Sequence, residues 1–250
     1  MSADRHPLRT MLKNLELRAA LPDADRQAIL ALPHNVKMLE AGTYTLREAE
    51  PIERCGVLVS GFAYRQKLTG EGARQIIGLH IAGDAVDLQH LFLDVADHSI
   101  QMLTRGEMAF VALAPFQELV RSRPAIGHAV LVKILVEASI FREWVLNVGR
   151  RDARARTVHL LCELAIRLDR EGLTDQYGYE LPMTQEQLGD ALGLTSVHVN
   201  RTLRSLEADG MLKRAKRSIS FPDWDKLRSE GDFNQRYLHL EMQRGSAQRT

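Results

Sequence analysis

Three side chains between Thr195 and Gly210 lie on one side of a predicted helix and could contact a nucleic acid. On a helical wheel, Val197, Arg201 and Arg204 lie opposite an apolar face. That apolar face consists of Val199, Leu203 and Leu206. An arginine on a helix in the major groove can donate two hydrogen bonds to guanine O6 and N7. The pattern therefore favours a DNA-reading surface, although a basic stripe is also typical of a solvated helix face.

The neighbouring residues predict a second helix directly before this one. Thr184 and Gln187 have the spacing of a capping box, so we expect a helix to begin at Thr184. Gly193 can end that helix in the left-handed conformation, and Thr195 can cap the next helix, which ends near Gly210. Two helices joined by a short turn that contains glycine form a helix-turn-helix.

A basic segment follows the two helices. Residues 213–217 are rich in lysine and arginine, and residues 218–221 alternate between polar and apolar. We expect a β-hairpin wing whose Lys213 and Arg214 contact DNA phosphates without reading bases. The whole chain holds 33 basic and 32 acidic residues, so a DNA-binding role depends on this local basic stripe.

The length of 250 residues predicts two domains of a globular protein. We find no apolar run of the roughly 18 residues that a membrane span needs, and no signal peptide, which favours a cytoplasmic protein. Cys55 and Cys162 are too distant in sequence for a CxxC pair and are expected to be free, buried thiols.

The pattern of residue types changes along the first two thirds of the chain. After helical residues up to Pro33, residues 34–115 consist of short aliphatic runs separated by glycines, which predicts a small β-sandwich or barrel with a hairpin at Gly70–Gly72. A helix from Ala125 to Asn147 and another from Ala153 to Asp169 follow, with a domain boundary near residues 148–152.

The first of these helices is apolar on more than one side. It must be covered both by its own domain and by a further surface, and a second copy of the chain would supply that surface. A single well-buried core helix is the alternative. We predict a homodimer whose interface contains Ile126, Val130, Ile134, Ile140 and Trp144.

The segment TQEQLGDALGLTSVHVNRTLRSLEADGML resembles the helix-turn-helix of the Crp/Fnr family of bacterial transcription regulators. The resemblance extends to VGRRDARARTVHLLCELAIRL and, more loosely, to the glycine-punctuated β segment, so that it spans about residues 21–238. It implies an α+β protein with a sensor domain over residues 1–122, a double-stranded β-helix (jelly-roll) of the cyclic-nucleotide-binding type. A long dimerisation helix over residues 123–150 and a winged helix-turn-helix over residues 151–250 follow.

The same resemblance implies a homodimer that binds palindromic promoter sites in double-stranded DNA, with RNA polymerase as a further partner. The implied base-reading positions are Ser196, Val197, Asn200 and Arg201, and the full predicted DNA-binding set adds Thr195, His198, Arg204, Lys213 and Arg214. Val197 stands where the family usually has an acidic residue. Because valine can contact a thymine methyl group but cannot accept from cytosine N4, we expect a different half-site.

The predicted effector pocket departs further from cyclic-AMP-binding members. An ungapped match places Asp87 and Leu88 at the family's Gly-Glu pair, and His98 and Ser99 at its Arg-Ser pair. A cyclic phosphate buried without a fixed cation is costly, so we expect a regulator that does not depend on cyclic AMP. Two cysteines are too few for the four-cysteine iron-sulfur cluster of oxygen-sensing members.

The sequence also leaves other roles for the β segment open. His80, His90 or His98 could ligate haem, or the segment could be a metal-binding, cupin-like enzyme or sensor whose winged helix contacts protein. These histidines lack the HxH-plus-Glu spacing of such a metal site, and no nucleophile elbow, P-loop or GxGxxG motif is present. We therefore predict no enzymatic activity, no cofactor and no metal, and the sequence identifies no small-molecule effector.

Overall fold

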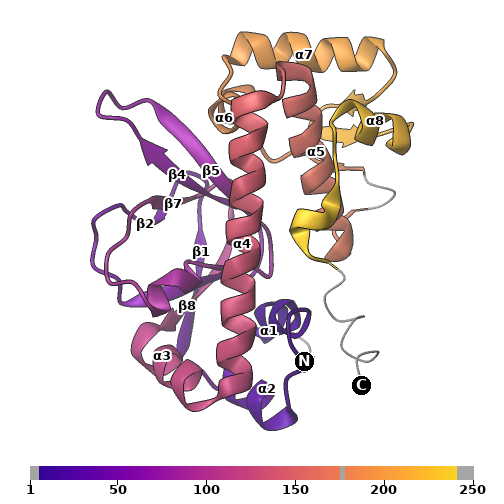
Figure 1. Ribbon diagram of the computed structural model, residues 1–250. Helices are drawn as coiled ribbons and strands as arrows, with labels where there is room; N and C mark the ends of the chain where they lie inside the picture. Colours follow the sequence, from indigo (N-terminus) through magenta and orange to yellow (C-terminus); the bar gives the residue numbers. More distant parts are fainter. Residues whose placement is uncertain (1–5, 175–177, 241–250) are drawn as a thin grey trace. The chain divides into compact units, whose positions relative to one another are not determined.

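The computed structural model describes residues 6–174 and 178–240 (Figure 1). Among these residues, one compact unit comprises the chain up to Arg65, Leu79–Ser139 and the segment from Leu238, and a second comprises Gln66–Gly78 and Ile140–Tyr237. The first five residues of the predicted sensor domain, and residues 175–177 and 241–250 of the predicted DNA-binding domain, lie outside the described chain. The three-part division of the sequence stays a prediction.

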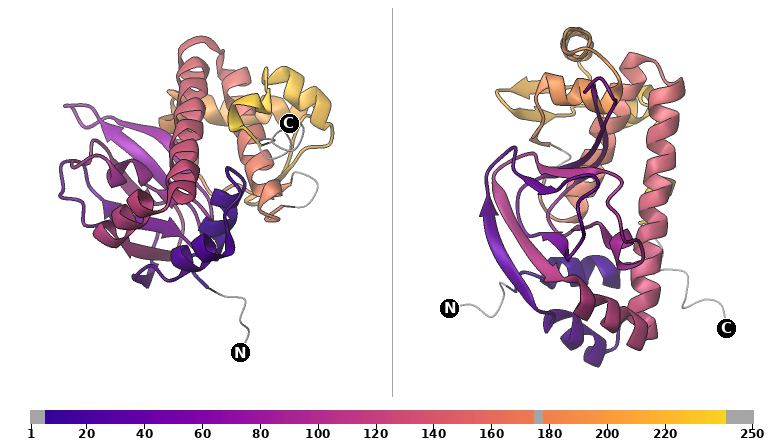
Figure 2. Two further views of the ribbon diagram at one scale, coloured as in Figure 1. Left: turned by 60° about the horizontal axis from the view of Figure 1, so that its bottom comes forward. Right: turned by 90° about the vertical axis from the view of Figure 1, so that its left-hand side faces the viewer.

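Two four-stranded antiparallel sheets form the roll of the sensor (Figure 2). One has the order β1-β8-β3-β6 and the other the order β2-β7-β4-β5. The strands are β1 (His34–Leu39), β2 (Tyr44–Leu46), β3 (Arg54–Leu58), β4 (Ala63–Leu68), β5 (Arg74–His80), β6 (Ala85–Val86), β7 (Ser99–Met102) and β8 (Gly106–Ala112). The predicted α+β class and β-roll are confirmed, and the Gly70–Gly72 turn joins β4 to β5 as expected.

Strands β3 and β8 explain why the roll has two small cores. Side chains alternate across a strand, so successive residues pack on opposite faces of the sheet. Val57 and Ala109 pack against the helices, whereas Leu58 and Met108 pack against Ile100 inside the roll. Both faces of this sheet are therefore buried, which fits the near-continuous apolar runs in the sequence.

Short helices close the sensor. These are α1 (Arg9–Glu16), α2 (Asp23–Leu30), the 3₁₀ helix η1 (Leu88–Leu91) and α3 (Leu113–Ser122). Cys55 on β3 is a free thiol with no solvent exposure, as expected, and burial raises its pKa well above the usual value. It is therefore a protonated core residue.

Helix α4 runs without a break from Pro124 to Arg150. Gly149, which the sequence pattern placed between two helices, lies inside it. The helix is also long and apolar enough to cross a membrane by length and composition, so the expectation that the chain holds no such run was wrong. Its first half packs instead into the sensor core through Ile126, Ala129 and Val130.

The exposed side of α4 differs from the predicted interface. Three residues of the predicted dimer interface, Ile126, Val130 and Trp144, are at most 7% exposed because they pack within their own chain. Ile134 and Ile140 are half-buried. Apolar side chains that do reach the surface are Leu131, Leu135, Phe141, Val145 and Leu146.

The second unit contains the winged helix-turn-helix. The elements of this region are α5 (Ala153–Arg170), β9 (Tyr179–Glu180), α6 (Gln185–Leu192), α7 (Ser196–Ala208), β10 (Lys213–Ala215), β11 (Ser218–Ser220), α8 (Trp224–Glu230) and η2 (Gln235–Leu238). The last residue of η2, Leu238, lies one position beyond the end of the second unit. Asp152 caps α5 by accepting from the backbone N–H groups of Arg154 and Ala155. The three short strands form one antiparallel sheet.

A buried carboxylate organises the centre of this unit. Glu163 on α5 is fully buried and accepts hydrogen bonds from Trp144 Nε1 at 3.0 Å and from the Tyr237 hydroxyl at 2.9 Å. Arg167 lies 3.3 Å from the same carboxylate. Buried charges need such partners. Trp144 is therefore fixed by a polar contact inside its own chain, and this is the physical reason that it is not on the surface.

Candidate DNA-binding surface and sensor cluster

Helices α6 and α7 form the predicted helix-turn-helix, and local chemistry accounts for its boundaries. Thr184 and Gln187 make both hydrogen bonds of the capping box, and Thr195 accepts from the backbone of His198 at 3.2 Å. Gly193 adopts a left-handed φ of +63° at the end of α6. A side chain at Gly189 would meet the Leu194 carbonyl oxygen at 2.4 Å, so the turn after α6 approaches this position too closely for any other residue.

The outer face of α7 presents most of the residues that the sequence predicted. Val199, Leu203 and Leu206 are buried, which turns the opposite face towards solvent. Val197 is 71% exposed, and Arg201 and Arg204 are also exposed. Thr195, Ser196 and His198 are exposed at the N-terminal end, and Asn200 is half-buried. The helix therefore presents its N-terminal turns and two guanidinium groups together, as a major-groove reader requires.

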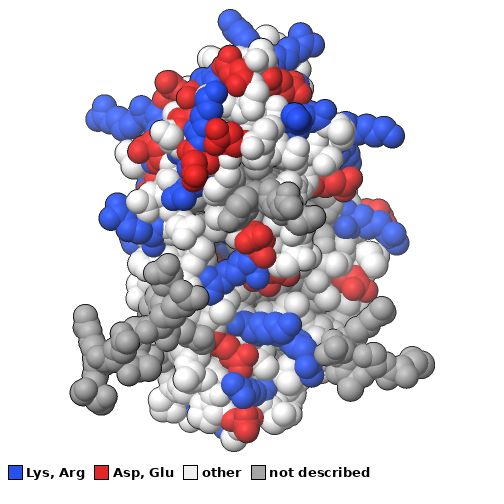
Figure 3. Space-filling view, turned by 90° about the vertical axis from the view of Figure 1, so that its right-hand side faces the viewer, with Lys and Arg blue, Asp and Glu red and all other residues white. Residues whose placement is uncertain are grey.

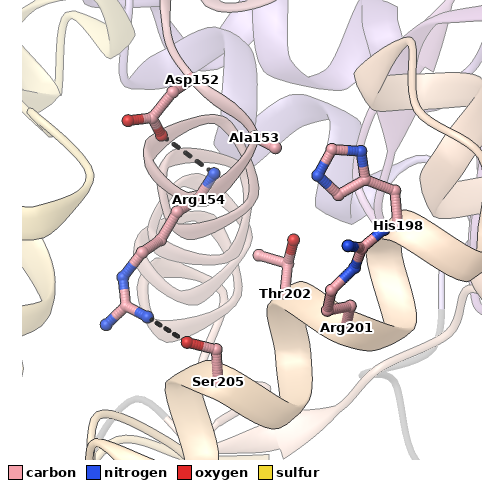
Figure 4. A pocket seen from close by; sticks show the side chains of 7 residues that line it. All are labelled: Asp152, Ala153, Arg154, His198, Arg201, Thr202 and Ser205. Atoms are coloured by element: carbon pink, nitrogen blue, oxygen red, sulfur yellow. Dashed lines mark hydrogen bonds between the residues drawn. The ribbon is translucent and has the colours of Figure 1, made fainter.

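Two hollows lie on either side of Arg201. The first, of about 470 Å³, is lined by Asp152, Ala153, Arg154, His198, Arg201, Thr202 and Ser205 (Figure 4). The second, of about 420 Å³, is lined by Gln185, Ser196, Val197, Asn200, Arg201 and Arg204. Arg201 lines both hollows.

Arg154 is a residue of this surface that the sequence reasoning missed. Its guanidinium donates to Ser205 Oγ at 2.8 Å, pairs with Asp209 at 2.6 Å and also bonds Glu230. It thereby connects α5, α7 and α8, and Figure 4 shows its bond to Ser205 on α7. The basic residues before α5 gave a signal of positive charge, but only the fold reveals that Arg154 is held by carboxylates.

The β-hairpin wing forms as predicted, but its basic side chains differ in whether a carboxylate of the same chain already binds them. Lys213 is exposed on β10, and Lys216 and Arg217 lie exposed between β10 and β11. Arg214 instead bonds Glu207 on α7, and this bond and the Arg214 charge lower the pKa of the Glu207 carboxyl. A phosphate contact by Lys213 stays a prediction. The same role for Arg214 would require it to leave or share Glu207.

Gln185, at the first turn of α6, also escaped the sequence reasoning. The Asn200 side-chain amide donates from Nδ2 to Gln185 Oε1 at 3.0 Å. The two residues stand 15 positions apart, so no local pattern joins them. This bond links the two helices at the rim of the second hollow.

In the sensor, two residues of the predicted effector site come together. His98 Nε2 lies 2.8 Å from Asp87 Oδ1, and His98 Nδ1 lies 2.6 Å from Asp97 Oδ1. Leu88 is fully buried in the apolar core, and Ser99 Oγ accepts from the backbone N–H of Glu48. The imidazole at the position of the family's phosphate-binding arginine is thus already engaged by two carboxylates.

Further charged residues extend this cluster to α4. Arg65 Nη2 lies 3.6 Å from both Asp87 and Glu137, and Lys133 Nζ lies 3.0 Å from Asp84. Lys133 also approaches Glu137 at 3.7 Å. These residues come from β4, the β6 region and α4, and the sequence gave no sign that they meet. We call Arg65, Asp84, Asp87, Asp97, His98, Lys133 and Glu137 the sensor cluster.

Burial and neighbouring charged groups shift the pKa values of Asp87 and His90. Burial alone would raise the pKa of the Asp87 carboxyl, but the His98 hydrogen bond and the Arg65 charge outweigh it, so the pKa is lowered. His90 is 1% exposed and stacks on His98 with ring centroids 5.7 Å apart. Burial lowers the pKa of His90, because neither ring nitrogen has a hydrogen-bond partner within the described residues to stabilise the charged form.

The cavity beside the cluster is small and acidic. It measures about 190 Å³, and its lining includes Glu50, Glu53, Arg54 and Asp87. Ligand pockets for small molecules usually measure about 300–1,000 Å³. The Arg54 guanidinium stacks on the Phe110 ring at 4.3 Å, and Arg105 is exposed and pairs with Glu40. The described residues thus present a poor site for a buried anion.

Comparison with known proteins agrees with this architecture. A model of the cyclic nucleotide-binding domain matches residues 36–123, and a model of the Crp-like helix-turn-helix domain matches residues 155–230. The chain belongs to the Crp/Fnr family. As in that family, it is a DNA-binding transcription regulator and not an enzyme. The two matches correspond to the roll and to the winged helix described above.

Relatives of this Crp/Fnr protein are transcriptional activators. It is 27% identical to the transcriptional activator protein FnrL of Cereibacter sphaeroides over 83% of this chain and 85% of the relative. It is 30% identical to the transcriptional activatory protein AadR of Rhodopseudomonas palustris over 62% and 64% of the two chains. The metal-binding, cupin-like alternative gains no support, because within residues 6–174 and 178–240 no three His, Cys, Asp or Glu side chains could hold a metal ion.

Solved structures share the fold. The structure of FixK2 from Bradyrhizobium japonicum matches with a TM-score of 0.71 at 22% identity, over 80% of this chain and 98% of that one. A transcriptional regulator of the same family from Thermus thermophilus, TTHB099, matches with a TM-score of 0.62 at 15% identity, over 78% and 96%.

Proposed function

We propose that this Crp/Fnr regulator binds palindromic promoter sites as a homodimer, with α7 reading bases and the wing contacting phosphates. The observation that supports this most is the exposed face of α7, where Arg201 stands between two hollows. The surface in Figure 3 mixes lysines and arginines with acidic side chains, so binding depends on the local basic stripe and not on net charge. We further propose that the regulator contacts RNA polymerase and acts in the cytoplasm.

Salt dependence of binding tests the DNA-binding mode. Each neutralised phosphate lowers the slope of log affinity against log salt by about 0.9, so specific and random duplexes should both bind more weakly as salt rises. Specific duplexes should retain a preference at every salt concentration. A salt-independent affinity would contradict phosphate contacts, and equal affinity for all sequences would contradict base reading.

The exposed stripe on α4 supports a homodimer. The stripe follows a heptad pattern, because Leu131, Ala138 and Val145 stand seven residues apart and Leu135 stands four residues after Leu131. The side chains of Leu131, Leu135 and Val145 are 50–58% exposed. Such a stripe is typical of a two-stranded coiled coil. The covering surface proposed here is the same stripe of a second copy, related by a two-fold axis.

The sensor cluster supports regulation that does not depend on cyclic AMP. His98 and Arg65 are committed to carboxylates, and a cyclic phosphate would have to displace Asp87 or leave it buried beside a second negative charge. Either change costs several kcal/mol, roughly the range for an unpaired buried charge.

Calorimetry with cyclic AMP and cyclic GMP, run beside DNA-binding measurements, tests this part of the proposal. Full-length protein without nucleotide should bind its site, and neither nucleotide should raise the affinity. Micromolar nucleotide binding that raises DNA affinity tenfold or more would contradict it.

A further inference from the structure

The amide pair of Gln185 and Asn200 lies at the rim of the hollow beside Arg201. Asn200 Nδ2 donates to Gln185 Oε1 at 3.0 Å, and both side chains are half-buried. On the wheel, Asn200 falls about 40° from Arg204 and about 60° from Val197, so it belongs to the same outward arc of α7. Gln185 reaches this arc from α6.

The hydrogen bond to Gln185 leaves a defined set of groups on Asn200. An asparagine amide carries two N–H donors and one carbonyl acceptor. Gln185 occupies one donor, so one N–H and Oδ1 remain. Adenine presents the complementary pair in the major groove, because N7 accepts and the N6 amino group donates.

The bond also restricts how Asn200 can rotate. A free asparagine side chain must be ordered when it binds a base, and that ordering weakens binding. A side chain already held by Gln185 avoids part of this loss. Rotation of the Asn200 amide by a half turn would place its carbonyl against Gln185 Oε1, so, with Gln185 in this orientation, the bond selects which groups of the Asn200 amide are offered.

We propose that Gln185 is a positioning residue for base recognition, and that it holds the Asn200 amide so that each half-site requires an adenine beside the base contacted by Arg201. This inference rests on the proposed role of α7 in reading DNA. The competing interpretation is that the bond only joins α6 to α7 and stabilises the helix-turn-helix.

Base preference separates the two interpretations. Selection from a random duplex library with full-length protein defines the preferred site, and fluorescence anisotropy then measures affinity for that site and for every single base-pair change. Asn200→Ala should lower discrimination at one adenine by about 5- to 100-fold. Gln185→Ala should lower discrimination at that same adenine by about 3- to 10-fold, and the double variant should equal Asn200→Ala alone.

Two further variants serve as controls. Gln185→Glu keeps an acceptor for Asn200 Nδ2 and should keep the adenine preference, while its added charge weakens all duplexes alike. Glu186→Ala changes the neighbouring exposed residue of α6 and should leave the preference unchanged. Thermal melting of each variant checks that the fold is retained.

The outcomes are distinct. If the wild-type protein enriches no sequence, the base-reading role of α7 fails, and this proposal fails with it. If a site is selected but Gln185→Ala weakens every duplex equally, Gln185 is only structural and the positioning role is wrong. A base other than adenine at the position sensitive to Asn200→Ala would also overturn the proposal.

Discussion

The homodimer interface on α4 can be tested by shortening Leu135. Fully burying a leucine side chain contributes about 1.5–3 kcal/mol, and alanine keeps only a small part of that apolar surface. Because Leu135 is 57% exposed in the single chain, about 1 kcal/mol per protomer remains to be gained on association. A two-fold axis places two copies in the interface, so Leu135→Ala should destabilise the dimer by about 2 kcal/mol.

This free energy corresponds to a rise in the dimer dissociation constant of about 30-fold. Analytical ultracentrifugation across a concentration series measures it directly, at a temperature well below the melting point. The matched control is Val130→Ala on the same helix. Val130 is fully buried in the sensor core, so its truncation should lower the melting temperature of the protomer and leave the dissociation constant nearly unchanged.

The two variants together decide which face of α4 meets the second copy. A dimer weakened by Val130→Ala but not by Leu135→Ala would refute the assignment from exposure. A protein that stays monomeric at every concentration, with or without DNA, would refute the homodimer itself.

Three further predictions concern DNA contacts, pH and helix capping. Arg201→Ala should weaken binding to the specific site by roughly 1–3 kcal/mol and reduce the base preference at one base pair. Lys213→Ala should weaken binding to all sequences alike and reduce the slope of log affinity against log salt by about one. Equal losses for Arg201→Ala on specific and random duplexes would rule out its reading role. Burial lowers the pKa of His90 in the folded protein. The neutral His90 therefore contributes its full stabilisation above the unfolded pKa of about 6.5, and this contribution is lost as the pH falls below that value. The free energy of unfolding should fall by at most about 1.4 kcal/mol per pH unit there. His90→Phe should flatten that part of the denaturation profile below pH 6.5, and an unchanged profile would show that His90 is not the responsible group. Thr184→Ala removes the capping box of α6 and should lower the free energy of unfolding by about 0.5–2 kcal/mol in urea titrations, with a loss near zero as the contrary result.

The amino-acid sequence determined the helix boundaries of the helix-turn-helix almost completely. The boundaries of α6 and α7 follow from caps and turns within a few residues, such as Thr184 with Gln187 and the left-handed Gly193. These interactions are local, so the pattern of residue types is sufficient to place them. The outward position of Arg201 follows equally from the helical period.

Tertiary structure alone decided the contacts between residues that are distant in sequence. Arg65, Asp87 and Glu137 meet because β4, the segment after β6 and α4 pack together, and no spacing rule predicts that meeting. The surface of α4 is a similar case. A helix apolar on several sides gives no period that tells which side its own domain covers, so only the packing reveals that Val130 is buried and Leu135 is exposed.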